Sequence, residues 1–377
     1  MRIAIDARGI NWYRGTGIGT YTEKLLENLI NIDSENYYHI YWSGYGYEKY
    51  KQENTRLLMA SKKHHRFFEQ YFFPYNLSKE EIDLYHIPQN GIGLSEDIRC
   101  KSIVTIHDLI PYVMPETVGK GYLTKFLKEM PKVVANSSAI LTVSEWSKKD
   151  ILKFFPIDEN KIYVTPLAAD SKYKPLDKEK CRAFLQEQYN ITKPFILYIG
   201  GFSSRKNVRS LIIAFSKLYK KLDKEYNLVI VGANRDDGQK LTELSTNLDL
   251  SSKIIFTGFA PEDHLPILYC GSEVFVYPSL YEGFGLPPLE AMNCGTPVIT
   301  SKVTSIPEVV GDAGMLIDPN SAAELMDAIE KVLCSDKIKA ELRVKGLKRA
   351  SEFSWKNTSK KTLEAYTEVY NYLETNL

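Results

Sequence analysis

The stretch VFVYPSLYEGFGLPPLE, residues 274–290, places a short apolar run, a glycine-bearing loop and the start of a helix in immediate succession. Residues 274–277 are β-branched or aromatic, which favours a buried strand. Pro287 and Pro288 suit the first turn of a helix, where no amide donor is needed. Strand, loop and helix in this order predict one unit of a parallel α/β sheet, with the loop at the ligand-binding carboxyl end of the strand.

The loop within this stretch has the residues of a phosphate and sugar site. Gly283 and Gly285 let the backbone bend closely around a ligand, and the helix start at Leu286 favours a diphosphate through its dipole and its unpaired amides. Glu290 lies about one turn into the helix, placed to accept two ribose hydroxyls, and Glu282 is placed to bind a sugar. The alternative is a structural turn with two solvated glutamates.

The rest of the chain repeats the same alternation of strand and helix. Amphipathic helices are predicted over residues 208–222 and 322–333, among others. Two series of strands covered by helices predict two doubly wound parallel sheets. The predicted strands are residues 3–7, 39–42, 84–87, 103–106, 140–143 and 162–165, and then 195–199, 228–231, 254–257, 274–277, 298–300 and 315–317.

Two domains follow from these series. The polar stretch 170–193 separates them, and we place the boundary near residue 175. The N-terminal domain is residues 1–175, completed by a last helix over 354–377, and the C-terminal domain is residues 176–353.

Composition narrows the class of protein. The 377 residues include 48 Lys and Arg against 47 Asp and Glu, whereas nucleic-acid binders usually carry a basic excess. The five cysteines form no Cys-x-x-Cys pair, which favours reduced thiols. No apolar run approaches the roughly 18 residues that span a bilayer, and residues 1–7 are too short for a signal peptide. We therefore expect a cytoplasmic protein that binds no nucleic acid.

Adjacent cations follow the first strand of the second series. Arg205 and Lys206 come just after residues 195–199, where a guanidinium fork and a compact ammonium can neutralise a diphosphate leaving group. Taken alone, such a pair is more often a solvated surface pair, but its place at the end of a strand favours the site.

Glycines and histidines mark the N-terminal domain. Gly15, Gly17 and Gly19 resemble a dinucleotide fingerprint without its last glycine, and they suit a close backbone approach to a phosphate or sugar. His107 follows the run 103–106 into the predicted crevice. The weaker acceptor-side candidates are Gly15, Gly19, His86 and Asp108.

A metal clamp is missing from the sequence. No two aspartates are separated by one residue, so the sequence contains no Asp-x-Asp pair of the kind that holds a metal ion at a diphosphate. We expect no metal and no other cofactor, with Arg205, Lys206 and helix amides stabilising the diphosphate instead.

Together these segments resemble the retaining glycosyltransferases of family four, in the mannosyltransferase-like branch. The resemblance covers nearly the whole chain and is densest over residues 254–318, where Glu282 and Glu290 stand eight positions apart as the family's hallmark. It implies the GT-B fold, in which two Rossmann-like domains face a central cleft and the last helix crosses back to the N-terminal domain.

The resemblance also implies roles for individual residues. Glu290 would bind the ribose and Glu282 the donor sugar, Arg205 and Lys206 the diphosphate, and His107 would lie near the transferred sugar. Gly201 stands where many members carry an arginine, which leaves the role of Arg205 open. The remaining implied donor contacts are Gly17, Phe259, Ala260, Gly283, Phe284, Gly285 and Leu286, with His107, Lys206 and Glu282 as the catalytic set.

The implied reaction is transfer of a sugar from a nucleotide donor, first of all mannose from GDP-mannose, to a glycan or lipid-linked acceptor of a bacterial surface polysaccharide. The alternatives are a UDP-hexose or UDP-N-acetylhexosamine donor, or a GT-B-like epimerase or sensor. Residues 62–68 mix cations with aromatics and are followed by Tyr71, Phe72 and Phe73. They suit a peripheral contact with an anionic membrane, or an amphipathic helix whose aromatics are core.

Overall fold

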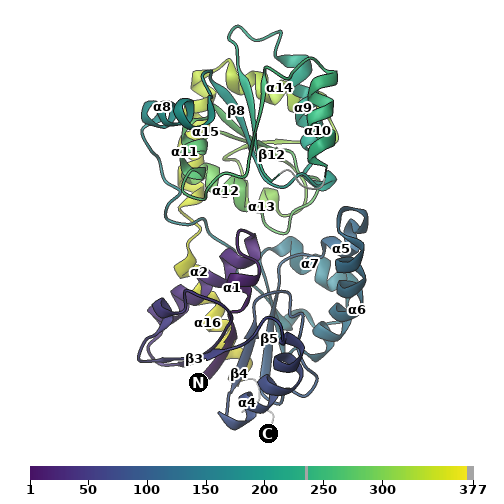
Figure 1. The fold of residues 1–377 in the computed structure, drawn as a ribbon, viewed down its shortest axis with the longest axis vertical. Coiled ribbons are helices and arrows are strands. Elements are labelled where there is room, and N and C mark those ends of the chain that lie inside the picture. The colour runs from purple at the N-terminus through teal and green to yellow at the C-terminus, as the bar shows by residue number, and fades with distance from the viewer. Residues whose placement is uncertain (234–236, 372–377) are drawn as a thin grey trace. The chain divides into compact units, whose positions relative to one another are not determined.

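The computed structural model of the chain describes residues 1–233 and 237–371. They form two compact units, which Figure 1 draws as a ribbon: unit 1 is Met1–Leu167 with Ser354–Leu377, and unit 2 is Ala168–Phe353. The expected boundary near residue 175 falls inside unit 2, because Tyr173 is buried there and its ring packs edge-on against Tyr269.

Unit 1 is built on a parallel sheet with the strand order β3-β2-β1-β4-β5-β6-β7. The expected apolar runs all form strands, but β3 was not predicted; it is a half-buried edge strand that begins with the polar residues Thr55 and Arg56. The strands are β1 (Arg2–Asp6), β2 (Tyr37–Trp42), β3 (Thr55–Met59), β4 (Leu84–Ile87), β5 (Lys101–Ile106), β6 (Ala139–Thr142) and β7 (Ile162–Val164).

Helices cover both faces of this sheet. On one face α2 packs against α16, and on the other a hydrophobic core joins Phe73 of α4 to Phe126 of α6 and Ile151 of α7 (Figure 1). The helices described in unit 1 are α1 (Gly9–Trp12), α2 (Gly17–Ile32), α3 (His65–Phe67), the π-helix η2 (Phe68–Phe72), α4 (Phe73–Lys79), α5 (Ile110–Val113), α6 (Lys120–Asn136), α7 (Glu145–Phe154) and α16 (Trp355–Asn371), with short 3₁₀ turns η1 (Glu48–Tyr50), η3 (Pro115–Thr117) and η4 (Glu159–Lys161).

Unit 2 repeats the architecture with the strand order β10-β9-β8-β11-β12-β13. Its strands are β8 (Phe195–Ile199), β9 (Asn227–Val231), β10 (Ile254–Gly258), β11 (Val274–Tyr277), β12 (Val298–Ser301) and β13 (Met315–Ile317). Its described helices are α8 (Lys178–Tyr189), the 3₁₀ turn η5 (Ser204–Lys206), α9 (Val208–Leu218), α10 (Gly238–Asn247), α11 (Leu265–Gly271), α12 (Leu286–Asn293), α13 (Ile306–Val310), α14 (Ala322–Leu333) and α15 (Asp336–Ala350). The two doubly wound sheets expected from the sequence are confirmed.

The strand order reverses once in each sheet. In unit 1 the strands that follow β1 are added on one side of it, as β2 and β3, and the strands from β4 onward are added on the other side. In unit 2 the same reversal falls between β8 and β11. Ligands of doubly wound sheets bind beyond the carboxyl ends of the strands at such a switch point. The residues that follow β1 and β4, and those that follow β8 and β11, are therefore where each unit can hold a ligand.

The last helix belongs to unit 1. On α16, the Thr358 hydroxyl donates to the carbonyl of Pro166 at 2.6 Å, and the Tyr366 hydroxyl lies 2.6 Å from His86 Nδ1. The expected helix over 354–377 is observed from Trp355 to Asn371, and residues 372–377 lie outside the described residues.

His86 is a core residue, which corrects its expected place on the acceptor side. Its side chain is fully buried, and its second nitrogen, Nε2, lies 2.8 Å from Thr105 Oγ1. Burial, with a smaller effect of His107, lowers the pKa of His86 to about 3. A neutral imidazole with both nitrogens engaged ties β4 and β5 to α16.

Of the three N-terminal glycines, Gly19 is required by packing. Helix α2 begins at Gly17 after Thr16, whose hydroxyl accepts the amide of Gly19 at 3.4 Å. A Cβ on Gly19 would lie 2.3 Å from the carbonyl oxygen of Tyr13, whereas a Cβ on Gly17 would meet nothing within 4 Å. Gly19 therefore serves the fold of unit 1, and Gly15 and Gly17 remain exposed.

We expect Gly19→Ala to lower the free energy of unfolding of unit 1 by about 1–3 kcal/mol, because the backbone of Tyr13 has to move away from the new methyl group. Gly17→Ala adds the same atom in open space and should stay close to wild type. All four tryptophans lie in unit 1, so urea unfolding followed by tryptophan fluorescence reports on this unit. Equal losses in the two variants would contradict the steric argument.

Candidate active site

The carboxylate of Glu282 lies at the switch point of unit 2 and collects hydrogen bonds from both loops there. Its side chain is 12% exposed. Its Oε1 accepts from four donors: Lys206 Nζ at 2.6 Å, Arg205 Nη1 at 2.9 Å, Tyr277 Oη at 2.9 Å and Ser279 Oγ at 2.5 Å. Arg205 and Lys206, expected to bind the diphosphate, and Glu282, expected to bind the donor sugar, therefore form one ion cluster.

Asn207 fixes the loop that carries the two cations. It adopts a left-handed conformation with φ of 56° directly after η5, and its Nδ2 donates to the carbonyls of Pro278 and Pro319 at 3.1 and 2.8 Å. The amide of Leu280 in turn donates to the carbonyl of Arg205 at 2.8 Å. The loop after β8 is thus bound to the loop after β11, which holds Arg205 beside Glu282.

The ion cluster carries a net positive charge. Burial alone would raise the pKa of Glu282, but the neighbouring charges of Lys206 and Arg205 and the hydrogen bonds to the carboxylate lower the pKa to about 2. Two cations and one ionised carboxylate sum to +1. The cluster can therefore accept a further anion.

The glycine loop is held from behind by the segment after β12. The Ser305 hydroxyl donates to the carbonyls of Glu282 and Phe284 at 2.8 and 2.9 Å, and Thr304, at φ of 58°, accepts the amide of Glu282. Gly285 has φ of +116°, and a Cβ there would lie 2.8 Å from Ile306 Cδ1. Thr304 is β-branched, and a β-branched residue at positive φ is strained. Backbone strain of this kind is concentrated at functional sites.

The geometry leaves amide donors at the start of α12. With Ser305 engaging the carbonyls of the loop, the amides of Gly285 and Leu286 donate to no acceptor among the residues that the structure describes. Pro287 and Pro288 follow in the first turn, where no donor is needed. This helix start is suited to an anion, as the sequence predicts.

Glu290 lies one turn into α12 in a different electrostatic setting. Its Oε2 accepts a hydrogen bond from the Tyr269 hydroxyl at 3.0 Å. Burial raises the pKa of Glu290 to about 7, against the smaller lowering effects of Tyr269 and Tyr173. Two glutamates of one loop and helix therefore differ in ionisation, with Glu282 fully ionised and Glu290 near its midpoint at neutral pH.

Phe259 and Ala260 follow β10 at one edge of the same sheet. Phe259 is 73% exposed and Ala260 is buried. An exposed aromatic ring beyond the carboxyl end of a strand is available to stack on a planar ligand. The expected contact of Phe259 and Ala260 with a base stays a prediction.

His107 sits at the carboxyl end of β5 in unit 1. Its Nε2 lies 2.8 Å from the carbonyl oxygen of Pro88, to which it must donate, and its amide donates to Asn90 Oδ1 at 3.0 Å. Burial lowers the pKa of His107 to about 4. The imidazole is therefore neutral, with Nδ1 as an acceptor, and the neighbouring Asp108 accepts the amide of Ile110 at the start of α5.

Sequence reasoning assigned no role to several residues that build the ion cluster. Tyr277, Ser279 and Thr304 bind Glu282 through hydroxyl groups, and Asn207 joins the two loops. Tyr277 is the last residue of a strand otherwise made of Val and Phe. Its hydroxyl group at the carboxyl end of that strand is the feature of the sequence that could have identified it as a site residue. The others lie in loops whose folding depends on the neighbouring strands.

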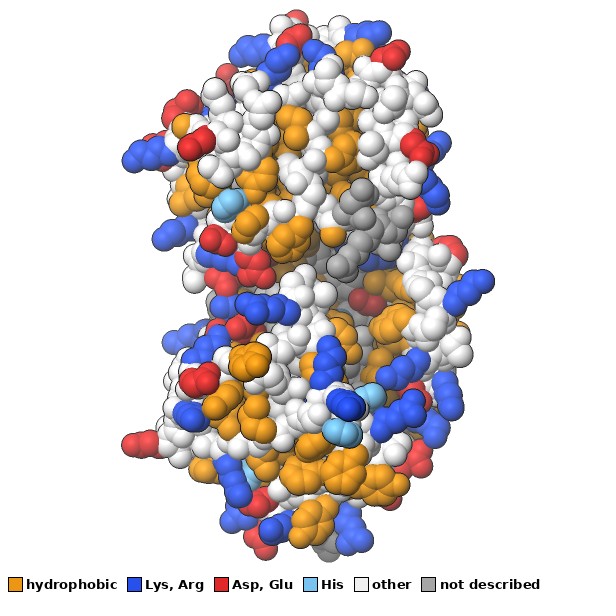
Figure 2. Space-filling view, in the orientation of Figure 1, with side chains coloured by type: hydrophobic (Ala, Val, Ile, Leu, Met, Phe, Trp, Pro, Cys, Tyr) orange, Lys and Arg blue, Asp and Glu red, His pale blue; other side chains and the backbone are white. Residues whose placement is uncertain are grey.

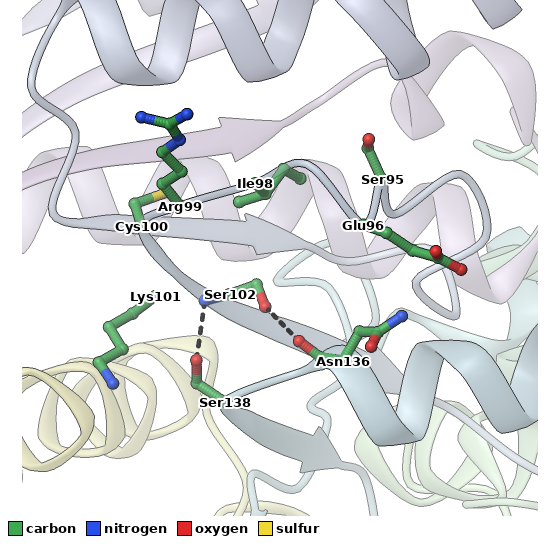
Figure 3. Close-up of a pocket in the computed structure, with 9 residues that line it drawn as sticks. All are labelled: Ser95, Glu96, Ile98, Arg99, Cys100, Lys101, Ser102, Asn136 and Ser138. Atoms are coloured by element: carbon green, nitrogen blue, oxygen red, sulfur yellow. Dashed lines mark hydrogen bonds between the residues drawn. The ribbon is translucent and has the colours of Figure 1, made fainter.

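A pocket of about 300 Å³ lies away from the ion cluster, in unit 1, at the amino-terminal ends of strands β5 and β6 (Figure 3). There the amide of Ser102 donates to Ser138 Oγ and the Ser102 hydroxyl to the carbonyl of Asn136. These residues precede or begin β5 and β6, whereas ligands of such sheets bind at the carboxyl ends. We therefore place the candidate site at the ion cluster. The pocket is lined by Ser95, Glu96, Ile98, Arg99, Cys100, Lys101, Ser102, Asn136 and Ser138.

Among residues 1–233 and 237–371, no group of three or more His, Cys, Asp or Glu side chains is arranged to hold a metal ion. Within the same residues, no helix is long and apolar enough to cross a membrane.

Known structures share this fold. The sucrose-phosphate synthase of Thermosynechococcus elongatus matches with a TM-score of 0.76 at 20% identity, over 99% of this chain and 100% of that one. HepE of Anabaena, solved in complex with UDP and glucose, matches with a TM-score of 0.76 at 16% identity, over 97% and 99% of the two chains. Two parallel-sheet units with these neighbours define a protein of the GT-B fold.

Sequence comparison gives the family. Residues 182–349 match the family described as glycosyl transferases group 1. The chain is 36% identical over 266 residues to O-antigen chain mannosyltransferase B of Escherichia coli, covering 71% of this chain and 70% of that protein. It is 30% identical to the serotype-specific mannosyltransferase WbdA of the same species, over 73% of this chain but only 34% of that longer protein. The chain belongs to the group 1 glycosyltransferases, and it is a hexosyltransferase.

We expect Glu282→Gln to lower the free energy of unfolding of unit 2 by roughly 3 kcal/mol at neutral pH, from the lowering of a carboxyl pKa of 4.5 to about 2. A lowered pKa stabilises the fold above pH 4.5, and this contribution is lost as the pH falls toward 2. The difference in the free energy of unfolding between wild type and Glu282→Gln should therefore become smaller as the pH falls from 4.5 toward 2. Urea unfolding followed by circular dichroism measures it, with tryptophan fluorescence reporting separately on unit 1.

Glu225→Gln is the matched control, because Glu225 also pairs with two lysines, Lys193 and Lys253, but is exposed. Water and salt screen such a pair, so this variant should stay near wild type. A Glu282→Gln variant as stable as Glu225→Gln at pH 7 would contradict the assigned ion cluster.

Proposed function

We propose that this chain transfers mannose from GDP-mannose, with retention of configuration, to a glycan or lipid-linked acceptor of a bacterial surface polysaccharide. The observation that carries the transferase chemistry is the Glu282 carboxylate held by Arg205 and Lys206 at the switch point of unit 2. The names of the relatives support the donor and the pathway, since O-antigen chain mannosyltransferases are among them. A UDP-linked hexose or N-acetylhexosamine is the alternative donor.

The leaving group decides the chemistry of unit 2. As the bond to the nucleoside diphosphate breaks, positive charge grows on the sugar and negative charge on the diphosphate, as in glycosidase transition states. Lys206 and Arg205 stabilise the diphosphate more strongly as that charge develops, which lowers the barrier. Their positive charge, together with the amides of Gly285 and Leu286, makes the proposed step independent of a metal ion.

The remaining donor contacts are proposed along the same edge of the sheet. Glu290 binds the ribose hydroxyls, and Phe259 with Ala260 flanks the base. The backbone at Gly283 and Phe284 contacts the sugar and the diphosphate, and Glu282 presents its carboxylate to the sugar. The burial of Glu282 among four donors supports a fixed orientation of that carboxylate.

Unit 1 contributes Gly17 and His107 in this proposal. Gly17 is exposed and leaves room for a close backbone approach. His107 is neutral, and its Nδ1 can accept a hydrogen bond from a sugar hydroxyl. We therefore assign it to orienting the sugar, while the leaving phosphate takes the proton of the acceptor.

A panel of nucleotide sugars tests the donor. GDP-mannose should raise the melting temperature of the chain more than UDP-glucose, UDP-N-acetylglucosamine or dTDP-glucose at the same concentration. A ligand present at 100-fold its dissociation constant adds about 2.7 kcal/mol to the free energy of unfolding. A larger shift with a UDP-sugar would replace mannose by the alternative donor, and no shift with any nucleotide sugar would reject the proposal.

With the preferred donor, Lys206→Ala should cut turnover about 10²-fold, because a preorganised charge at the leaving group contributes roughly 3 kcal/mol to the barrier. Release of the nucleoside diphosphate measures this, with and without EDTA. Lys302→Ala is the control, since Lys302 pairs with Glu324 on the surface of the same unit. Near-normal turnover of Lys206→Ala would remove Lys206 from the mechanism.

The segment from Lys62 to Tyr75 is the second feature that bears on function, and we propose that it rests on an anionic membrane. Phe73 is core, but Phe67, Tyr71 and Tyr75 are 54%, 66% and 64% exposed at a spacing of four residues. Figure 2 shows Lys, Arg and His side chains beside exposed hydrophobic side chains on unit 1. Exposed aromatics beside cations fit the interface of a bilayer with anionic headgroups. A lipid-linked acceptor would lie at such a surface.

We expect the chain to float with liposomes that contain phosphatidylglycerol and not with phosphatidylcholine alone. Replacing Lys62, Lys63 and Arg66 by Gln should weaken binding about 100-fold, since each cation contributes about 1 kcal/mol near such a surface. The triple variant Lys217, Lys220 and Lys221→Gln removes the same charge from unit 2 and should float like wild type. Equal loss in both triple variants would point to a general charge effect and contradict the proposed surface.

A further inference from the structure

A cluster of buried polar side chains occupies the switch point of unit 1, and the donor chemistry of unit 2 leaves it without a role. Asp6 is the last residue of β1, and Gln89 follows β4 by two residues. Asp6 Oδ2 accepts from Gln89 Nε2 at 2.6 Å. These are the carboxyl ends of the two strands between which the strand order reverses, where a doubly wound sheet holds its ligand.

Arg8 is the centre of this cluster. Its guanidinium donates to both oxygens of Asp6, from Nε at 2.7 Å and from Nη2 at 2.6 Å, and it is 1% exposed. The rings of Trp12 and Phe73 lie 4.5 and 4.7 Å from it. A guanidinium held between two aromatic rings and by one bidentate carboxylate has a fixed orientation.

The polar atoms of the cluster are not all satisfied. Arg8 Nη1, Gln89 Oε1 and Trp12 Nε1 are buried and have no hydrogen-bond partner among the described residues. Buried polar groups are nearly always paired, so unpaired ones in a native fold call for a ligand, a water or a functional reason. Two donors and one acceptor in one cluster are what a hydroxyl-rich ligand, directly or through a water, would satisfy.

Glu69 is the partly exposed carboxylate next to Arg8. Its side chain is 15% exposed, and Oε1 lies 3.2 Å from Arg8 Nη2. It lies in the π-helix η2, a rare irregularity that is frequently found at functional sites. Gly93, at φ of +100°, permits its approach, because a Cβ there would lie 2.8 Å from the carboxyl carbon of Glu69.

The charge of the cluster selects against anions. Asp6 and Glu69 outnumber Arg8, so the sum is −1, the reverse of the ion cluster in unit 2. A phosphate or a carboxylate would meet two like charges, whereas a neutral sugar ring offers hydroxyls that donate to Glu69 and accept from the unpartnered N–H groups of Arg8 and Trp12.

We propose that Asp6, Arg8, Trp12, Glu69 and Gln89, together the Arg8 cluster, bind the neutral terminal sugar of the acceptor through its hydroxyl groups. The proposal rests on the proposed function, because it names the acceptor class for that transferase. Glu69 and Trp12 contact the sugar, and Asp6 and Gln89 position Arg8 behind them.

Saturation-transfer NMR with methyl α-D-mannopyranoside and methyl α-D-glucopyranoside tests the site in the full chain without donor. Wild type should bind at least one of the two glycosides. Trp12→Phe removes the indole N–H but keeps a ring over Arg8, and Glu69→Gln removes a charge with little change of size. Each should weaken binding at least fivefold. Trp355→Phe removes another buried, unpartnered indole N–H of unit 1 and should bind like wild type.

Three results would overturn the proposal: no glycoside bound by wild type, equal binding by all variants, or displacement of the glycoside by inorganic phosphate. Tryptophan fluorescence in urea verifies that each variant is folded. If Trp12→Phe does not fold, Glu69→Gln still tests the proposal, because Glu69 is partly exposed and its replacement disturbs the core less. The thermal shift with GDP-mannose is measured on the same samples. A nucleotide shift without glycoside binding rejects the Arg8 cluster alone, and glycoside binding without any nucleotide shift rejects the proposed function alone.

Discussion

The pairing of one buried carboxylate with two cations organises the candidate site of unit 2. A carboxylate that is 12% exposed is costly to bury unless it is paired and hydrogen-bonded, and Oε1 of Glu282 accepts from four donors. Because Arg205 and Lys206 follow β8 while Glu282 follows β11, the same contacts also join the two loops at the switch point. Removing Glu282 would leave two cations crowded together, so the position of each cation depends on this carboxylate.

The two units share one fold, but the side chains at their switch points differ in the sign of their summed charge. Both sheets reverse their strand order at the same place, and in both the residues beyond that place are charged. In unit 2 two cations surround one carboxylate, which suits a diphosphate. In unit 1 one cation, Arg8, lies between Asp6 and Glu69, which suits a neutral polyol. In both proposals the fold determines the position of the site in each unit, and the sign of the local charge distinguishes a diphosphate site from a site for a neutral sugar.

The sequence predicted what depends on local pattern. Continuous apolar runs predicted the central strands of both sheets, and Lys206 and Glu282 were expected to bind the donor beyond the ends of two of those strands. Their direct contact was not predicted, because it depends on the order of β8 and β11 in the sheet. The half-buried edge strand β3, which begins with Thr55 and Arg56, was not predicted. The role expected for His86 was wrong, because its burial depends on Tyr366, which is 280 positions away in the chain. The Arg8 cluster was missed for the same reason, since Glu69 and Gln89 come from distant segments.

Glu282 and Glu290 show how one loop and helix can hold two carboxyl groups for different tasks. Burial acts on both in the same direction, toward a higher pKa. In Glu282 the charges of Lys206 and Arg205 overcome it and lower the pKa to about 2, whereas in Glu290 the neutral hydroxyls of Tyr269 and Tyr173 do not, and the pKa rises to about 7. A permanently ionised carboxylate can hold two cations in place at any physiological pH. A carboxyl group near its midpoint can both donate and accept, which matches a pair of vicinal hydroxyls that also do both. The separation of the two pKa values therefore supports the two proposed roles, in which the ionised Glu282 holds Arg205 and Lys206 beside the donor sugar and Glu290 binds the ribose hydroxyls.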